Sequence, residues 1–211
     1  MHQQPFDLTL YIVTDGKDCL KERVGLALQG GATCVQYREK IKLYEQMLEE
    51  AAVLHLLCKQ YQVPLFINDH VQLAMELGAE GIHLGQSDIG NHNLRSLAEH
   101  MIVGISAETV EQAVHAEQAG AHYLGVGACF PTGSKEDASY IELSVIKQIR
   151  QAVSIPIVLI GGINEVTLPK LQNYSFDGIA MISAILAAEE PKHVTQLFKQ
   201  QIRDMKQVHQ I

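Results

Sequence analysis

The stretch Gly78-Ala79-Glu80-Gly81-Ile82-His83-Leu84-Gly85-Gln86-Ser87-Asp88 contains the unit from which the fold can be inferred. Its Gly-Ala pair suits the end of a helix, because glycine adopts the left-handed cap conformation and the small residue after it allows a tight turn. The apolar run 81–84 has the length of a short buried strand. Polar residues of the kinds that bind phosphate or metal follow that run. The stretch therefore predicts a helix end, a strand and a polar strand end, in that order.

The same unit recurs along the chain. Gly30-Gly31-Ala32 and Gly120-Ala121 also stand between an expected helix and an expected strand. Short apolar runs alternate with helical segments from end to end, and this pattern favours a parallel sheet. We expect strands at residues 8–13, 33–38, 65–67, 81–84, 102–105, 123–126, 157–160 and 178–182.

Eight strands alternating with helices predict an α/β fold, the (β/α)8 TIM barrel. An open, doubly wound sheet is the alternative. We see no linker rich in Pro, Gly or Ser, so we expect a single domain over residues 1–211. Barrel enzymes keep their active sites where the carboxyl ends of the strands meet, so the polar strand ends form the candidate site.

Composition and charge restrict the classes of function. The chain of 211 residues has a net charge of −8 and contains 47% hydrophobic and 19% charged residues. This balance fits a soluble globular protein and argues against a nucleic-acid-binding or anionic-membrane surface. The four cysteines show neither CxxC nor zinc spacing, which favours reduced thiols. We see no signal peptide and no apolar run of the ~20 residues needed to span a bilayer, so we expect a cytoplasmic protein.

Gln36, Arg38 and Lys40 occupy alternate positions at the end of an expected strand. Alternate residues of a strand share a face, so these three side chains are expected to point into the barrel mouth. Two cations and an amide suit a diphosphate, because arginine offers a fork of donors and lysine a point charge. A solvated strand end is the alternative. Tyr37 and Glu39 alternate to the other face, and we expect them to be structural.

Two carboxylates follow the next two strands. Asn68 and Asp69 come directly after the run 65–67, and Asp88 comes soon after the run 81–84. If these strands are neighbours, roughly 4.8 Å apart, both carboxylates can reach one point. Mg²⁺ is commonly held by one or two carboxylates together with substrate phosphates. A helix N-cap is the alternative for Asp69, and the residue type taken alone favours it.

Further strand ends carry candidates for phosphate binding. The loop after the sixth strand combines hydroxyls, a glycine and a lysine, although a plain exposed turn is the alternative. Gly161-Gly162 ends the seventh strand and Ile182-Ser183 the eighth, where many barrels bind phosphate through backbone N–H groups. Ser106 adds a hydroxyl at the same rim. The loop residues in question are Thr132, Gly133, Ser134 and Lys135.

Taken in order, these segments resemble the thiamine-phosphate synthase family, over about residues 10 to 187. The resemblance rests on the ordered segments at 36–40, 67–69, 81–88, 104–107, 125–127, 130–132, 160–163 and 182–185. It implies a (β/α)8 barrel and a Mg²⁺-dependent transferase of thiamine biosynthesis with small-molecule substrates. The implied reaction joins 4-amino-2-methyl-5-(diphosphooxymethyl)pyrimidine to 4-methyl-5-(2-phosphooxyethyl)thiazole, or its carboxylated form. The products would be thiamine phosphate and diphosphate.

By this resemblance the candidate residues divide into three groups. Mg²⁺ would be held by Asp69 and Asp88. The thiazole phosphate would be bound by Thr132, Ser134, Gly162, Ile182 and Ser183. The pyrimidine diphosphate would be held by Gln36, Arg38, Lys40, Asn68, Ser106 and Lys135, and the catalytic roles fall to Arg38, Lys40, Ser106 and Lys135.

The family is thought to react dissociatively, so that diphosphate departs before the thiazole nitrogen attacks. The cations and Mg²⁺ would neutralise the charge that develops on the leaving group. The sequence offers no evident Ser-His-Asp or Cys-His arrangement, and none is required. The protein would position the substrates, stabilise charge and exclude water.

Four features depart from the family pattern. Ser134 stands where a second threonine is common, which keeps the hydroxyl. His70 and Glu108 stand where arginine and histidine are frequent, and both could change the local charge. The segment after Lys40 also looks a few residues short. His83, within a strand, is expected to be a hydrogen-bonded core residue, whereas His70 could touch a ligand.

Two other functions fit parts of the pattern. A thiazole tautomerase is a related barrel, but we expect such an enzyme to lack the metal and diphosphate residues found here. A catalytically silent barrel that senses thiamine phosphates would keep the same binding residues, and only turnover separates it from a synthase. The sequence is compatible with a homo-oligomer and predicts neither a nucleic-acid nor a membrane partner.

Overall fold

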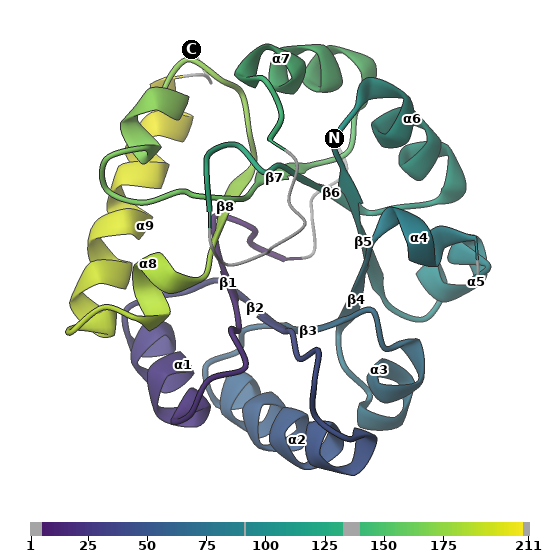
Figure 1. The fold of residues 1–211 in the computed structure, drawn as a ribbon, viewed down its shortest axis with the longest axis vertical. Coiled ribbons are helices and arrows are strands. Elements are labelled where there is room, and N and C mark those ends of the chain that lie inside the picture. The colour runs from purple at the N-terminus through teal and green to yellow at the C-terminus, as the bar shows by residue number, and fades with distance from the viewer. Residues whose placement is uncertain (1–5, 91, 133–139, 209–211) are drawn as a thin grey trace.

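A computed structural model describes residues 6–90, 92–132 and 140–208. Each of eight parallel strands pairs with the next along the chain, and the first pairs with the eighth, which closes the barrel. Helices surround the barrel as an outer ring (Figure 1). The prediction of a (β/α)8 barrel is confirmed, and the open-sheet alternative is wrong.

The strands lie close to the predicted positions, and helices alternate with them as expected. The strands are β1 (Leu10–Val13), β2 (Cys34–Tyr37), β3 (Leu65–Asn68), β4 (Gly81–Leu84), β5 (Ile102–Ala107), β6 (Tyr123–Val126), β7 (Ile157–Leu159) and β8 (Gly178–Met181). The longer helices are α1 (Leu20–Gln29), α2 (Tyr44–Gln60), α3 (Val71–Leu77), α5 (Leu94–Ala98), α6 (Val110–Ala119), α7 (Leu143–Ala152) and α9 (Pro191–Val208). In the described part of the chain, no helix is both long and apolar enough to cross a membrane.

Single-turn elements account for the main differences from prediction. The helices α4 (Gln86–Ile89) and α8 (Ser183–Leu186) follow β4 and β8, and both are too short to give a periodic apolar pattern. Between β7 and β8 the chain forms the 3₁₀ turn η1 (Leu168–Leu171) rather than an α-helix, and this turn has a proline at its start. Proline supplies no N–H to an α-helical ladder.

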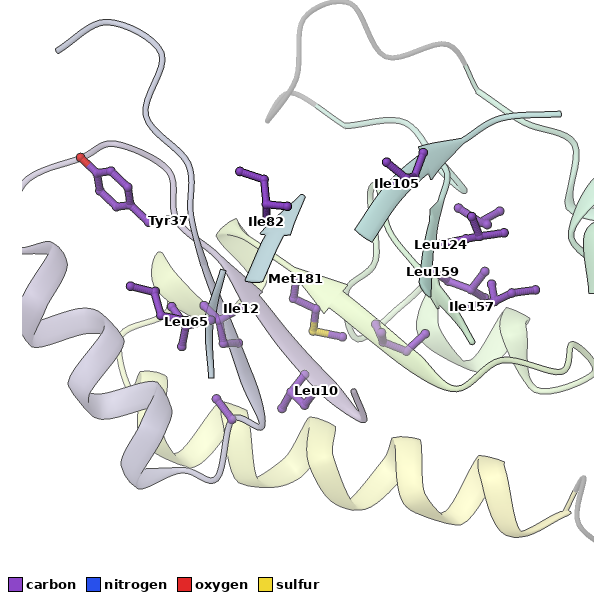
Figure 2. Close-up of a cluster of buried hydrophobic side chains, with 14 of the residues drawn as sticks. Leu10, Ile12, Tyr37, Leu65, Ile82, Ile105, Leu124, Ile157, Leu159 and Met181 are labelled. Carbon is purple, nitrogen blue, oxygen red and sulfur yellow. The ribbon is translucent and has the colours of Figure 1, made fainter. Parts of the chain in front are cut away.

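Alternation along each strand divides the core into two layers. Leu10 and Ile12 of β1 face outward and pack with residues from the other strands and the helices. Figure 2 shows part of this outer cluster, to which every strand contributes. Tyr11 and Val13 face inward and belong to a separate cluster inside the barrel. This arrangement follows from the two-residue period of a strand.

Aromatic rings fill the interior of the barrel. The rings of Tyr11, Phe66 and Tyr123 lie within 6.0 Å of one another, measured between centroids. Gly104 on β5 makes room for them, because a Cβ at this position would lie 2.1 Å from the Tyr123 ring. Glycine within a strand commonly marks such a close approach. The rings form a floor beneath the carboxyl ends of the strands.

Candidate active site

The end of β2 carries the three residues expected to bind diphosphate, but they lie at different depths. β2 ends at Tyr37, so Arg38 and Lys40 belong to the following loop, and strand alternation is not what orients them. Gln36 is buried, and its side-chain amide donates to the Tyr11 hydroxyl at 3.1 Å. Lys40 lies at the rim with half of its side chain exposed. The prediction of three side chains on one strand face is wrong in this respect.

Arg38 is half-buried and has a fixed backbone. Its N–H donates to Thr14 Oγ1 at 2.8 Å, and the Thr14 hydroxyl donates to the Arg38 carbonyl at 3.1 Å. Among the described residues, none accepts a hydrogen bond from the Arg38 guanidinium. A guanidinium that is partly desolvated and has donors to spare is suited to an anionic ligand.

Asp69 lies where β3 ends, and its carboxylate joins two of the predicted ligand-binding residues. The Asn68 side-chain amide donates to Asp69 Oδ2 at 2.6 Å, and the Lys40 ammonium pairs with the same oxygen. No described residue donates to Asp69 Oδ1. The backbone of Asp69 is left-handed, with φ of 61°, a conformation that costs a non-glycine residue energy and is found at functional sites.

The N-cap alternative for Asp69 is wrong. The cap position of α3 is His70, and no side chain caps this helix. Asp69 instead donates its own N–H to the His83 carbonyl on β4 at 2.9 Å. The Asp69 carboxylate therefore does not cap the helix. It contacts Lys40 and Asn68 and is placed to contact a ligand.

Asp88 lies on the neighbouring strand end, in the short helix α4. Its Oδ2 accepts the Gly85 N–H at 3.0 Å, and no described residue donates to Oδ1. β3 and β4 are paired with Asn68 opposite His83, so both carboxylates rise from adjacent strands. No group of three or more His, Cys, Asp or Glu in the described ranges could hold a metal. Two carboxylates, each with one oxygen that accepts from no described residue, fit a Mg²⁺ that takes its other ligands from phosphate and water.

A chain of hydrogen bonds crosses the barrel beneath the mouth. From Gln36 it runs through the hydroxyls of Tyr11 and Tyr123, which are 2.9 Å apart. His83 Nδ1 lies 2.9 Å from the Tyr123 hydroxyl, and its Nε2 lies 3.0 Å from Ser106 Oγ. The half-buried His83 is thus hydrogen-bonded through both ring nitrogens, as expected. The chain links two predicted site residues, Gln36 and Ser106.

Tyr11 and Tyr123 lie beneath the candidate site and bond to its residues, but the sequence pattern did not predict them as part of it. Burial raises the pKa of both phenols above the usual range, so both stay protonated at neutral pH. Each hydroxyl can therefore donate as well as accept. The signal that could have found them is their position, because the strand period places both on the inward face.

Removing the Tyr123 hydroxyl should break two hydrogen bonds of this network and destabilise the fold. We expect Tyr123→Phe to lower the free energy of unfolding by about 1–3 kcal/mol, because His83 and Tyr11 each lose a buried partner while the ring packing is kept. Urea unfolding measures the change. Tyr140→Phe is the matched control, since Tyr140 is 58% exposed, and its effect should stay within about 0.5 kcal/mol. Equal stability of wild type and Tyr123→Phe would mean that these bonds contribute nothing.

The loops after β6 and β7 are joined to each other. Cys129 N–H donates to the Ile160 carbonyl at 2.9 Å, and Phe130 N–H donates to the Gly161 carbonyl at 3.0 Å. Gly162 has φ of 62°, and a Cβ there would lie 2.5 Å from the Pro131 carbonyl oxygen. The half-buried Thr132 therefore follows a segment that is packed directly on Gly161 and Gly162.

The remaining predicted residues are distributed as follows. Ser106 is the fifth residue of β5 rather than part of the loop after it. Ile182 occupies the N-cap position of α8, and Ser183 is its exposed first residue. Ser134 and Lys135 lie outside the described residues.

A (β/α)8 barrel whose strand ends gather an arginine, a lysine and two carboxylates has the features of an enzyme that acts on phosphorylated substrates.

Residues 10–185 match the family model described as thiamine monophosphate synthase. The thiamine-phosphate synthase of Clostridium tetani is 46% identical over 91% of this chain and 94% of its own. That of Clostridium acetobutylicum is 43% identical over 88% and 90%. The solved thiamine phosphate pyrophosphorylase of Pyrococcus furiosus superposes with a TM-score of 0.85 at 36% identity, covering 94% of this chain and 96% of that one. The chain therefore belongs to the thiamine monophosphate synthase family, whose members are transferases.

Proposed function

We propose that the chain is a Mg²⁺-dependent thiamine-phosphate synthase formed by one domain over residues 1–211. It joins 4-amino-2-methyl-5-(diphosphooxymethyl)pyrimidine to 4-methyl-5-(2-phosphooxyethyl)thiazole, or the carboxylated thiazole, and releases diphosphate. The observation that carries the proposal is the cluster of Arg38, Lys40, Asp69 and Asp88 at the ends of β2, β3 and β4. Family membership supports the same reaction class.

The leaving diphosphate is the anion that this cluster suits. The Arg38 guanidinium has no acceptor among the described residues, and the Lys40 ammonium pairs with Asp69 at the rim. Mg²⁺, held by Asp69 and Asp88, would supply further neutralisation of the phosphate charge. Preorganised positive groups aimed at developing charge are a principal source of catalysis in a site shielded from water.

The bond changes balance without a protein nucleophile. The C–O bond between the pyrimidine methylene and diphosphate breaks, and its electron pair leaves with diphosphate. The electron-rich aminopyrimidine stabilises the resulting cation until the thiazole nitrogen lone pair forms the new C–N bond. Gln36, Asn68 and Ser106 line the path of the pyrimidine diphosphate and orient it, and their contacts within the barrel hold them in place.

The thiazole phosphate is assigned to the opposite side of the mouth. Thr132, Gly162 and Ser183 follow β6, β7 and β8, which are consecutive in the barrel. The first N–H groups of a helix have no partner within it and favour anions, so Ile182 and Ser183 would present backbone donors to the phosphate. Ser134 adds a hydroxyl from the same loop as Thr132. The two substrates then meet across the barrel axis.

Lys135 is assigned to the departing diphosphate rather than to the thiazole. We expect Lys135→Ala to lower kcat by about 100-fold, as loss of one preorganised cation does, with little change in KM for the thiazole phosphate. Steady-state kinetics with each substrate varied in turn measure both quantities. A raised KM for the thiazole with unaltered kcat would move Lys135 to the other substrate.

The proposal extends to partners and location. The substrates are small molecules, and the charge of −8 offers no general surface for nucleic acid. We propose a cytoplasmic enzyme, and a homo-oligomer is compatible with the chain.

A turnover assay tests the proposed function. Purified protein is incubated with the pyrimidine diphosphate, the thiazole phosphate and Mg²⁺, and thiamine phosphate is read by fluorescence after oxidation to thiochrome. We expect a signal that EDTA abolishes and that added Mg²⁺ restores. Ligand binding without product would support a sensor, whereas isomerisation of a thiazole carboxylate phosphate alone would support a tautomerase.

A further inference from the structure

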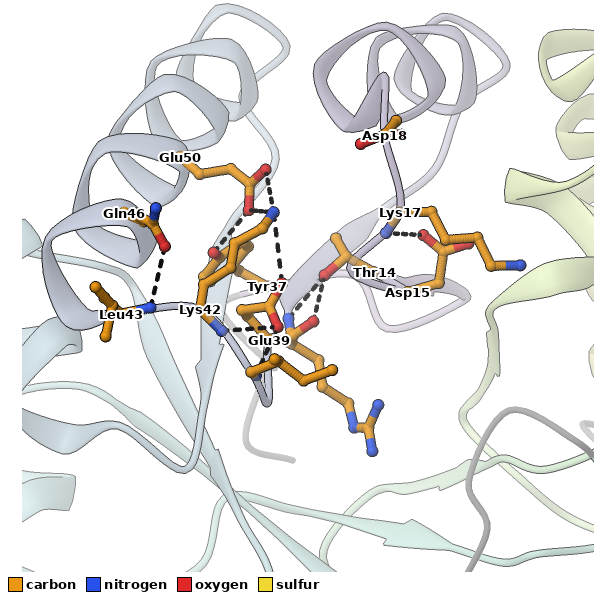
Figure 3. A network of polar contacts seen from close by, with 12 residues as sticks. Thr14, Asp15, Lys17, Asp18, Tyr37, Glu39, Lys42, Leu43, Gln46 and Glu50 are labelled. Atoms are coloured by element: carbon orange, nitrogen blue, oxygen red, sulfur yellow. Dashed lines mark hydrogen bonds and ion pairs between the residues drawn. The ribbon is translucent and has the colours of Figure 1, made fainter.

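The loop between β2 and α2 is built around a buried carboxylate. Glu39 is 6% exposed although it stands between Arg38 and Lys40 at the mouth. Its Oε1 accepts the backbone N–H groups of Lys40 at 2.7 Å, Ile41 at 2.8 Å and Lys42 at 3.4 Å. Figure 3 shows Glu39 at the centre of this network. One oxygen therefore fixes the backbone of three consecutive residues.

The other oxygen of Glu39 is less well satisfied. Oε2 is buried and has no hydrogen-bond partner among the described residues, although the Lys42 ammonium lies 3.5 Å away. Burial opposes ionisation, but the three N–H groups and Lys42 outweigh it, so the pKa of Glu39 lies below its usual value. A buried, ionised carboxylate with one unbonded oxygen is expensive, and such exceptions call for a functional explanation.

Apolar packing does little to anchor the segment 40–42. Ile41 is 92% exposed, and Leu43 at the start of α2 is 68% exposed, so the loop buries little apolar side chain. The Lys42 ammonium is itself held by both oxygens of Glu50 on α2, at 2.9 Å each. The Tyr37 hydroxyl donates to Glu50 at 2.8 Å, and the Tyr37 ring packs in the outer hydrophobic cluster. The backbone amides of the loop are thus held by Glu39, whereas Glu50 holds only the side-chain ammonium of Lys42.

We propose that Glu39 is a positioning residue that fixes the path of residues 40–42 and so directs the Lys40 ammonium to Asp69. Lys40 has a long, half-exposed side chain, so the origin of that side chain on the backbone decides which point it reaches. The two acidic residues act at different points. Asp69 pairs with the side-chain ammonium of Lys40, whereas Glu39 accepts hydrogen bonds from the backbone N–H groups of Lys40 and the two residues after it. What Lys40 then does for catalysis rests on the proposed function.

Hydrogen exchange tests the structural half of this inference without any substrate. We expect Glu39→Ala to accelerate amide exchange in the segment 40–42 by about tenfold or more, because three N–H groups lose their acceptor. Glu50→Ala is the matched control, since Glu50 belongs to the same network but accepts none of these amides. Unchanged protection of residues 40–42 in Glu39→Ala would overturn the inference, and it would do so even if the chain had no synthase activity.

A double-mutant cycle tests the functional half. We expect Glu39→Ala to lower kcat/KM for the pyrimidine diphosphate by about 10- to 100-fold, the loss that a small misplacement of a catalytic group can cause. In the Lys40→Ala background the same change should cost less than about twofold, because the residue being positioned is gone. Equal losses in both backgrounds would show that Glu39 acts only on stability and would overturn the positioning role.

A conservative variant separates positioning from folding. Glu39→Gln keeps a side-chain oxygen for the three amides, and we expect its kcat/KM and its exchange protection to exceed those of Glu39→Ala. Thermal unfolding of all variants verifies that each is folded at the assay temperature. If Gln and Ala variants lose the same activity and protection, the oxygen that accepts the amides is not what matters, and the inference fails. An inactive wild type with normal exchange behaviour would count against the proposed function alone.

Discussion

Asp69→Ala is expected to lower kcat/KM by about 1,000-fold or more, because a metal site supplies several kcal/mol of charge stabilisation and each 1.4 kcal/mol is tenfold in rate. Two effects combine at this residue. The variant removes one of the two carboxylates available to Mg²⁺ and also frees Lys40 and Asn68 from their shared acceptor. The thiochrome assay over a range of Mg²⁺ concentrations measures the loss.

Two variants separate this effect from damage to the fold. Alanine is disfavoured at the φ of 61° found at Asp69, which alone costs about 1–2 kcal/mol of stability. Asp69→Asn tolerates that backbone and retains stability, but it removes the charge, so we expect it to be nearly as inactive. Asp18→Ala, at an exposed carboxylate in the loop after β1, should leave kcat/KM unchanged. Wild-type-like activity in Asp69→Asn would remove Asp69 from the metal site.

Arg38→Ala is expected to lower kcat/KM by about 100- to 1,000-fold, as the loss of one preorganised donor to a developing negative charge does. Among the described residues the half-buried guanidinium has no acceptor, so its loss breaks no ion pair in that part of the chain and should leave stability nearly unchanged. Arg38→Lys should recover little, because an ammonium cannot reproduce the two-pronged contact with phosphate. Steady-state kinetics with the pyrimidine diphosphate varied will show this.

The pattern of the loss identifies the ligand of Arg38. A raised KM for the pyrimidine diphosphate together with a lowered kcat is expected from a residue that binds the diphosphate and stabilises its departure. Arg203→Ala, at an exposed arginine on α9, is the control and should retain full activity. If Arg38→Ala changed only the KM of the thiazole phosphate, the arginine would belong to the other half of the site.

The fold was predictable because its signals are local and repeated. Each helix end with glycine and a small residue, and each short apolar strand, is visible within a few residues of sequence. The stretch 78–84 therefore predicts its own turn and strand. The single-turn helices α4 and α8 were not predicted, since four residues carry no period. The extension of β5 to Ala107 was also missed, because Ser106 reads as a loop residue when its pairing with Gly125 is unknown.

The site was predictable as a location but not as a set of contacts. Polar strand ends indicate the mouth of the barrel from sequence alone. The pairing of Lys40 with Asp69 joins residues far apart in the chain, and the bond between the hydroxyls of Tyr11 and Tyr123 joins residues even farther apart. The sequence predicted only that Glu39 is structural. The structure shows that its carboxylate accepts hydrogen bonds from the backbone of the loop that follows it. Such contacts depend on closure of the barrel, which no local pattern encodes.

The most direct test of the assigned site is a crystal structure of the protein with Mn²⁺ in place of Mg²⁺, diphosphate and thiamine phosphate, with the metal located by anomalous scattering. We expect one Mn²⁺ bound by the carboxylates of Asp69 and Asp88 and by diphosphate oxygens, with Arg38 and Lys40 on the same diphosphate. The phosphate of thiamine phosphate should lie against Gly162 and Ser183. A metal bound away from both carboxylates, or a diphosphate that touches neither cation, would contradict the assignment.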